Sequence, residues 1–128
     1  MTRHVVDSSA WLEYFADGPS AEHFAPIIEK PEALLVPTIT LFEVFKRVAV
    51  QRDENDAIAC VAVMQQGEVV PIDAARALQA AKLSLKHRLP TADSLIYATA
   101  QQAGAELWTQ NADFEGLPGV RHFSKARI

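Results

Sequence analysis

Short apolar runs alternate along the chain with longer segments in which apolar residues recur at helical spacing. The short runs predict strands over residues 3–7, 33–36, 69–72, 106–109 and 120–123. The longer segments predict helices from Ser8 to the Gly18-Pro19 break, over 20–29, over 38–51, from Asp53 to Gly67, over 73–87 and over 91–103. This order is typical of an α/β domain and predicts an α/β/α sandwich around a central, mostly parallel sheet.

Residues at the ends of the predicted helices have the chemistry of caps. Ser8 or Ser9, Thr38 and Asp53 are placed to cap helix N-termini, and Gly104 is placed to end the 91–103 helix. In the helix that follows Asp53, Cys60 shares one face with other apolar residues. We therefore expect its thiol to lie in the core.

The composition narrows the class of protein. Apolar residues make up 49% and charged residues 22% of 128 residues, which predicts one globular domain over residues 1–128. A net charge of −4 argues against a protein that coats nucleic acid through bulk positive charge. The single cysteine and the lack of a signal-peptide pattern or a membrane-length apolar run predict a cytoplasmic protein with no membrane association.

Several kinds of site are excluded because their motifs are missing. One cysteine and four separated histidines lack zinc-ligand spacing, and the five glycines form neither a Walker loop nor a GxGxxG motif. Acidic residues are the remaining candidates for a site. In parallel sheets, functional residues lie beyond the carboxyl ends of the strands. Asp7 ends the first predicted strand, Asp93 lies in the first turn of the 91–103 helix, and Glu43 lies within the 38–51 helix.

Each of these acids also has an ordinary structural explanation. Asp7 suits a helix cap, Asp93 suits the positive end of a helix dipole, and Glu43 can pair with Arg47 four residues later. The segment 108–114 brings a hydroxyl, an amide and a carboxylate to the same edge of the sheet. The residues by themselves therefore leave two interpretations open, an oxygen-only metal site and a set of structural roles.

Four segments taken together resemble a known family. Residues 5–12, 40–44, 89–98 and 107–114 match, in order and spacing, the PIN domain of the VapC type, the ribonuclease toxin of bacterial toxin–antitoxin pairs. The resemblance covers nearly the whole chain and implies a single PIN-like domain. It also implies a metal-dependent endoribonuclease in which carboxylates hold Mg²⁺ or Mn²⁺ to activate water, leaving 5′-phosphate and 3′-hydroxyl ends.

The resemblance also implies which residues form the site. The acids that bind metal and carry catalysis are then Asp7, Glu43, Asp93 and Asp113. Ser8 stands in place of the family's frequent threonine, and Thr109 supplies a supporting hydroxyl. Asn111 occupies the position of the usual fourth acid, and Asp113 is the candidate to replace that acid. An amide oxygen carries no charge, so a second metal position is expected to be weak, and one-metal and two-metal use both stay open.

Two basic segments are candidates for holding the RNA backbone. Lys86 and Arg88 precede Pro90, and a second group comprises Arg121, Lys125 and Arg127. A solvated surface is the ordinary explanation for both groups. The resemblance further implies two protein partners, a VapB-type antitoxin that covers the acidic cleft and a second copy of the chain.

Two alternative functions stay open from the sequence. One is a binding module of the same fold in which the changed fourth acid reflects lost catalysis. The other is a phosphoacceptor receiver domain, which shares the length and the acids near the sheet edge. The receiver fits less well because paired acids do not follow the first strand and no lysine follows residues 106–109.

Overall fold

The computed structural model describes residues 2–125 and contains a parallel sheet in the centre of the fold. Within these residues five strands pair in the order β3-β2-β1-β4-β5, and every pairing is parallel. The strands are β1 (His4–Val6), β2 (Leu34–Pro37), β3 (Glu68–Val70), β4 (Glu106–Thr109) and β5 (Val120–His122). The prediction of an α/β fold with a mostly parallel sheet is confirmed.

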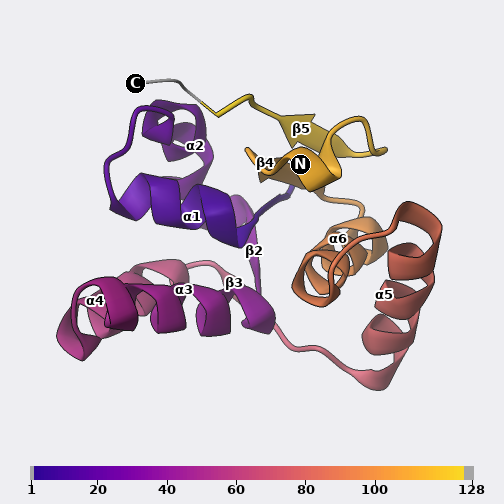
Figure 1. Ribbon diagram of the computed structural model, residues 1–128, viewed down its shortest axis with the longest axis horizontal. Helices are drawn as coiled ribbons and strands as arrows, with labels where there is room; N and C mark the ends of the chain where they lie inside the picture. The colour runs from indigo at the N-terminus through magenta and orange to yellow at the C-terminus, as the bar shows by residue number, and fades with distance from the viewer. Residues whose placement is uncertain (1, 126–128) are drawn as a thin grey trace.

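Helices cover both faces of this sheet (Figure 1). The helices are α1 (Ser8–Phe15), α2 (Ala21–Ile28), α3 (Thr38–Gln51), α4 (Glu54–Met64), α5 (Ala74–His87) and α6 (Thr91–Ala103). Short 3₁₀ turns span Pro31–Ala33 and Ala112–Phe114. None of the helices within residues 2–125 is long and apolar enough to span a lipid bilayer.

The hydrophobic core has two layers, one on each face of the sheet. Val6 and Val36 pack with α1 to α4 on one face, whereas Val5 and Leu35 pack with α5 and α6 on the other. Successive side chains of a strand point to opposite faces, so both layers follow from the same short apolar runs. Cys60 is buried in the first layer, which confirms its predicted place in the core.

Several predicted boundaries shift by a residue or two in the structure. Asp7, rather than Ser8 or Ser9, caps α1 through its side chain. Thr38 is the first residue of α3 and not its cap, because Pro37 holds the extended backbone before the helix. The strand predicted over 69–72 ends at Val70, where Pro71 brings no N–H to extend the ladder.

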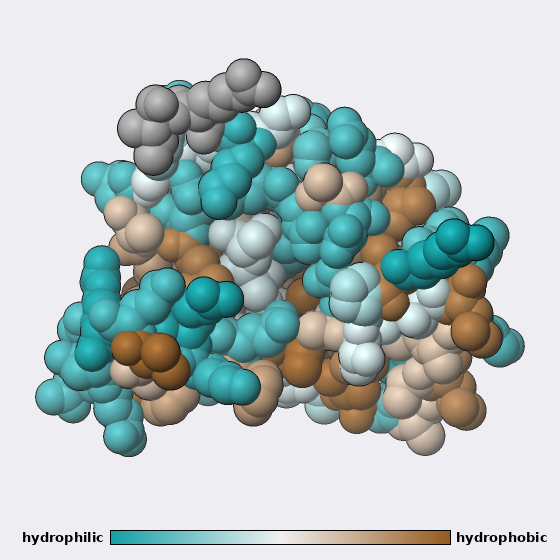
Figure 2. Space-filling view, in the orientation of Figure 1, coloured by the Kyte–Doolittle hydropathy of each residue, from teal (hydrophilic) through white to brown (hydrophobic). Residues whose placement is uncertain are grey.

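Some large apolar side chains stay on the surface, where Figure 2 shows brown areas over the lower left and the right of the molecule. One group lies on α3 and α4 and comprises Phe42, Val50, Ile58 and Val63. A second group on α5 comprises Leu78 and Leu85. Phe42 is 60% exposed, so of the aromatic residues on α3 it is the one that contributes to the surface rather than to the core.

Candidate metal centre

Asp7 lies at the carboxyl end of the central strand. Its backbone N–H donates to the carbonyl oxygen of Trp108 at 3.2 Å, which ties it to the end of β4. Its carboxylate accepts from the Ala10 backbone N–H at 3.2 Å and from the Ser9 hydroxyl at 2.9 Å. The side chain is only 2% exposed. Asp7 is therefore a helix cap and an acid at the sheet edge at once, so the two interpretations of this residue do not compete.

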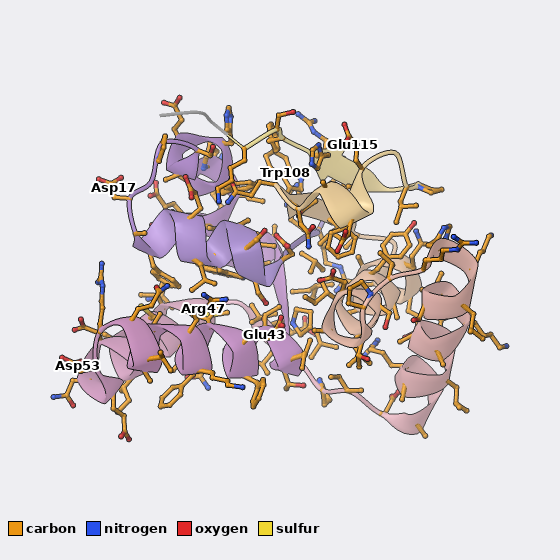
Figure 3. All side chains as sticks on the ribbon, in the orientation of Figure 1. Asp17, Glu43, Arg47, Asp53, Trp108 and Glu115 are labelled. Atoms are coloured by element: carbon orange, nitrogen blue, oxygen red, sulfur yellow. The ribbon has the colours of Figure 1, made fainter. Side chains whose placement is uncertain are left out.

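Glu43 faces α1 from the first half of α3. The Ser8 hydroxyl donates to a Glu43 carboxylate oxygen at 2.6 Å, so this bond joins α1 to α3 through two residues that are 35 positions apart in the chain. The ion pair with Arg47 that the spacing suggested is absent from the salt bridges of the described residues. Figure 3 labels Glu43 and Arg47 on the side of α3 that faces α1.

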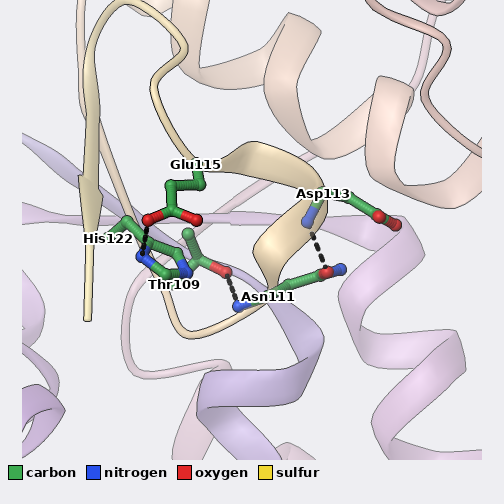
Figure 4. Close-up of polar contacts among 5 residues, drawn as sticks. All are labelled: Thr109, Asn111, Asp113, Glu115 and His122. Carbon is green, nitrogen blue, oxygen red and sulfur yellow. Dashed lines mark hydrogen bonds and ion pairs between the residues drawn. The ribbon is translucent and has the colours of Figure 1, made fainter. Parts of the chain in front are cut away.

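Asp93 enters the site from the first turn of α6. One of its carboxylate oxygens accepts from the side-chain amide of Asn111 at 3.3 Å. Asn111 is itself held in place, because its backbone N–H donates to the Thr109 hydroxyl at 2.8 Å and its amide oxygen accepts from the Asp113 backbone N–H at 3.0 Å (Figure 4). The turn after β4 thus fixes an amide beside the third acid.

These side chains line one cleft of about 690 Å³ between α1 and α3. The polar residues in its wall are Asp7, Ser8, Ser9, Glu43, Lys46, Arg47, Gln51, Asp93 and Asn111. Asp113 does not line the cleft, although its carboxyl lies close enough to Asp93 to share a hydrogen bond with it. Of these two residues, Asn111 is the one that lines the cleft.

Burial and neighbouring charges raise the pKa values of two acids of the site. Burial raises the pKa of Asp7 from 3.8 to about 6, despite the hydrogen bonds from Ser9, Ala10 and Thr109 that favour the carboxylate. The pKa of Asp93 is raised to about 7, first by burial, then by the hydrogen bond with Asp113 and by repulsion from the charges of Asp7, Asp113 and Glu43. The Asp93 carboxyl is therefore affected by acids from three other segments of the chain.

The donor set suits a hard divalent cation. Every candidate ligand is a carboxylate or amide oxygen, the ligand type that Mg²⁺ and Mn²⁺ prefer. No salt bridge among the described residues neutralises any of the four acids. Within residues 2–125 no three His, Cys, Asp or Glu side chains close around a single point as metal ligands. A cation would relieve the repulsion on Asp93 and would draw these side chains together.

The candidate RNA-binding residues lie outside the cleft. Lys86 and Arg88 are exposed at the C-terminal end of α5, where Arg88 adopts a left-handed conformation with φ of 56°. Arg121 is exposed on β5, Lys125 is exposed beyond it, and Arg127 lies outside the described residues.

Four polar residues of the cleft wall were not among the predicted site residues: Ser9, Lys46, Arg47 and Gln51. Ser9 donates to the Asp7 carboxylate, and the cations Lys46 and Arg47 lie in the cleft wall. Lys46 and Arg47 follow Glu43 at three and four residues, which is the helical spacing that places side chains on one face. That spacing is the signal that identifies both cations as neighbours of Glu43 on one face of the helix.

Comparisons with known proteins agree with this geometry. The family model described as PIN domain matches residues 4–120. A comparison with curated proteins gives no match. A toxin–antitoxin complex from Klebsiella pneumoniae is 25% identical with a TM-score of 0.76, and the match covers 92% of this chain and 95% of that chain.

Two further solved structures share the fold at lower identity. DNA-bound VapBC from Salmonella typhimurium has a TM-score of 0.73 at 18% identity, covering 96% of this chain and 98% of that one. The Mycobacterium tuberculosis toxin VapC20, described as cleaving the sarcin-ricin loop, has a TM-score of 0.75 at 19% identity, covering 91% and 96%.

Proposed function

The chain belongs to the PIN domain family, and we propose that it is a metal-dependent endoribonuclease that acts as the toxin of a toxin–antitoxin pair. The proposal treats residues 1–128 as one PIN domain that hydrolyses phosphodiester bonds in RNA in the cytoplasm. The observation that carries it is the convergence of Asp7, Glu43 and Asp93, from three separate segments, on one cleft. Nucleases form the broader class to which this family belongs, and the acidic cleft supports that chemistry here.

The residues that would hold Mg²⁺ or Mn²⁺ are the three acids of the cleft, with Asn111 or Asp113 at the fourth position. A bound divalent cation supplies Lewis acidity, lowers the pKa of coordinated water and neutralises charge on the scissile phosphate. One ion and two ions are both compatible with this donor set. An amide at the fourth position contributes no charge, so it favours weaker binding of a second ion.

The chain's other residues orient these acids. The Ser9 hydroxyl and the Ala10 N–H fix the Asp7 carboxylate, and the Ser8 hydroxyl fixes Glu43. The cations Lys46 and Arg47 lie in the same cleft wall and are placed to contact a phosphate. We further propose that Lys86, Arg88 and Arg121 contact the RNA backbone outside the cleft.

Substitution of the acids tests the proposal directly. Asp93→Asn and Glu43→Gln should each fold but lose Mg²⁺- or Mn²⁺-dependent cleavage of RNA by about a hundredfold or more, because each removes a charge from the cleft. The matched control is Glu22→Gln, which makes the same change on the exposed surface of α2. Cleavage at the wild-type rate by both cleft variants would refute the assignment.

A binding module without turnover is the second candidate function. The observation that favours it is Asn111, an amide in the cleft wall where the family usually has an acid. It predicts RNA binding with no cleavage at any Mn²⁺ concentration. A receiver domain does not fit, because receivers of the flavodoxin-like type have the strand order 2-1-3-4-5 and this sheet has the order β3-β2-β1-β4-β5.

Two protein partners belong to the proposal. One is a VapB-type antitoxin that covers the cleft, and the other is a second copy of the chain in a homodimer. Several solved structures with this fold are toxin–antitoxin complexes, and exposed Phe42 and Val50 adjoin the acids in the cleft wall. Expression of this protein alone should inhibit cell growth, and co-expression of an antitoxin encoded beside it should relieve the inhibition. The molar mass of the purified protein in solution tests the homodimer.

A further inference from the structure

A cationic and aromatic surface lies on the sheet face next to α2, outside the acidic cleft. The guanidinium carbon of Arg121 on β5 lies 4.8 Å from the ring centroid of Trp108 and 5.8 Å from that of Phe123. Phe123 in turn stacks on His23 of α2 with the ring centroids 4.8 Å apart. We call these four residues the stacking platform, and Figure 3 labels its Trp108 between α2 and the edge strand β5.

Arg121 is oriented but not neutralised. The residue is exposed, and its guanidinium forms neither a hydrogen bond nor an ion pair with any residue that the structure describes. The two aromatic rings hold the guanidinium by cation–π contact, which leaves its N–H donors free. A guanidinium held this way suits a phosphate, whose oxygens accept two parallel N–H bonds.

The stacking platform is connected to the cleft through the end of β4. The backbone N–H of Phe123 donates to the carbonyl oxygen of Thr109 at 2.9 Å, and that of Asp7 donates to the carbonyl oxygen of Trp108. The backbone of the platform and that of the first cleft acid therefore pair with consecutive residues of one strand.

We propose that the stacking platform binds a single-stranded segment of the RNA substrate next to the segment held in the cleft. A phosphate would contact Arg121, and a base would stack on the guanidinium or the aromatic rings of the platform. The inference rests on the proposed endoribonuclease function and adds a contact region beyond the cleft. A single strand fits better than a duplex, because bases in a duplex stack on one another and are not free to stack on aromatic rings and guanidinium planes.

Salt-dependent binding of a labelled single-stranded RNA tests the platform. Binding is measured by fluorescence anisotropy in a Glu43→Gln background, so that the RNA stays intact. Arg121→Ala should weaken binding by about tenfold, the effect of losing one charge-assisted hydrogen-bonded contact. It should also reduce the slope of log affinity against log salt by about 0.7, which is the contribution of one phosphate contact to a single strand.

Two matched variants separate the contributions of charge and of the planar guanidinium. Lys30→Ala removes the same charge from an exposed position just after α2, away from every proposed RNA contact, and should leave the slope unchanged. Arg121→Lys should keep the slope but still weaken binding, because it loses the stacked plane. RNA should also quench tryptophan fluorescence, since Trp11 is only 1% exposed and Trp108 is the tryptophan that RNA can reach.

The outcomes distinguish this inference from the proposed function. If Arg121→Ala and Lys30→Ala bind RNA with the same affinity and slope, the platform does not bind RNA, whatever the cleft does. If the wild-type chain never cleaves RNA but the slope falls in Arg121→Ala, the endoribonuclease is refuted and the platform stands. Arg121→Ala that loses affinity for an acidic protein partner but none for RNA would overturn the proposal in favour of a protein-binding surface.

Discussion

The Asp7→Asn substitution removes one charge from the cleft while it keeps the cap of α1. Asn caps helices about as well as Asp, so its amide oxygen can accept from the Ala10 N–H and the Ser9 hydroxyl as the carboxylate does. We expect this variant to be more stable than the wild type at neutral pH without divalent metal. We also expect it to gain much less stability when metal is added.

The magnitude follows from the pKa of Asp7. Burial raises this pKa from 3.8 to about 6, and the side chain is 2% exposed, so solvent screens the charge little. At about 1.36 kcal/mol for each pKa unit, the ionised carboxylate costs the folded chain about 3 kcal/mol above about pH 7. Ionised Asp93 also destabilises the folded chain, since its pKa is raised to about 7.

The sign of the pH dependence is therefore negative. A carboxyl with a raised pKa in the folded chain stays protonated after the unfolded chain has lost its proton, so the folded chain binds more protons between about pH 4 and pH 7. The free energy of unfolding of the wild type should fall across this window in the presence of EDTA. In Asp7→Asn the fall should be smaller by about 3 kcal/mol.

Urea unfolding followed by circular dichroism measures this difference. Wild type, Asp7→Asn and the surface control Glu22→Gln are compared at about pH 4 and about pH 8 in EDTA, and again with Mg²⁺ or Mn²⁺. Added metal should stabilise the wild type most at the higher pH, where both acids are ionised. Parallel pH profiles for wild type and Asp7→Asn in EDTA would show that the buried carboxylate does not destabilise the folded chain, and the electrostatic reasoning would be wrong.

Three further predictions concern the supporting residues. Ser8→Ala should lower the free energy of unfolding by about 1 kcal/mol and slow RNA cleavage, because Glu43 loses its 2.6 Å hydrogen bond; thermal melts and cleavage rates measure this, and an unchanged rate would contradict a positioning role. Asn111→Asp should tighten Mn²⁺ binding in calorimetry by about tenfold, since it adds a charged oxygen to the cleft wall, and unchanged affinity would place the fourth ligand elsewhere. Arg88→Gly should raise the melting temperature through a gain of about 1 kcal/mol, because φ of 56° suits glycine, and a lower melting temperature would show that the Arg88 side chain stabilises the turn.

Local pattern was sufficient to predict most of the elements. Residues 106–109 alternate in burial and form β4 at the predicted bounds, and Gly104 takes the left-handed conformation expected of the residue that ends α6. Asp53 caps α4 through its side chain as predicted. These features depend on the backbone and on residues three or four positions away, so they can be read without knowledge of the fold.

Contacts between distant segments were not accessible in the same way. Glu43 has Arg47 four residues away as a local partner, yet its carboxylate accepts instead from Ser8, which the parallel pairing of β1 with β2 brings to the same edge. Asn111 and Asp113 are both plausible fourth ligands by spacing, and the Thr109 hydroxyl is what holds Asn111 in place.

The alternation of strands and helices and the placement of Asp7 and Asp93 at helix starts can be predicted from the residue order alone, because both follow from short-range periodicity and capping. Which acids share a cleft, and the stacking of Arg121 on Trp108 of the neighbouring strand, become visible only in the folded chain. The reason is that side chains far apart in the chain meet through strand order and register. Strand order and register are set by how all the apolar faces are buried together, and no local pattern specifies that arrangement.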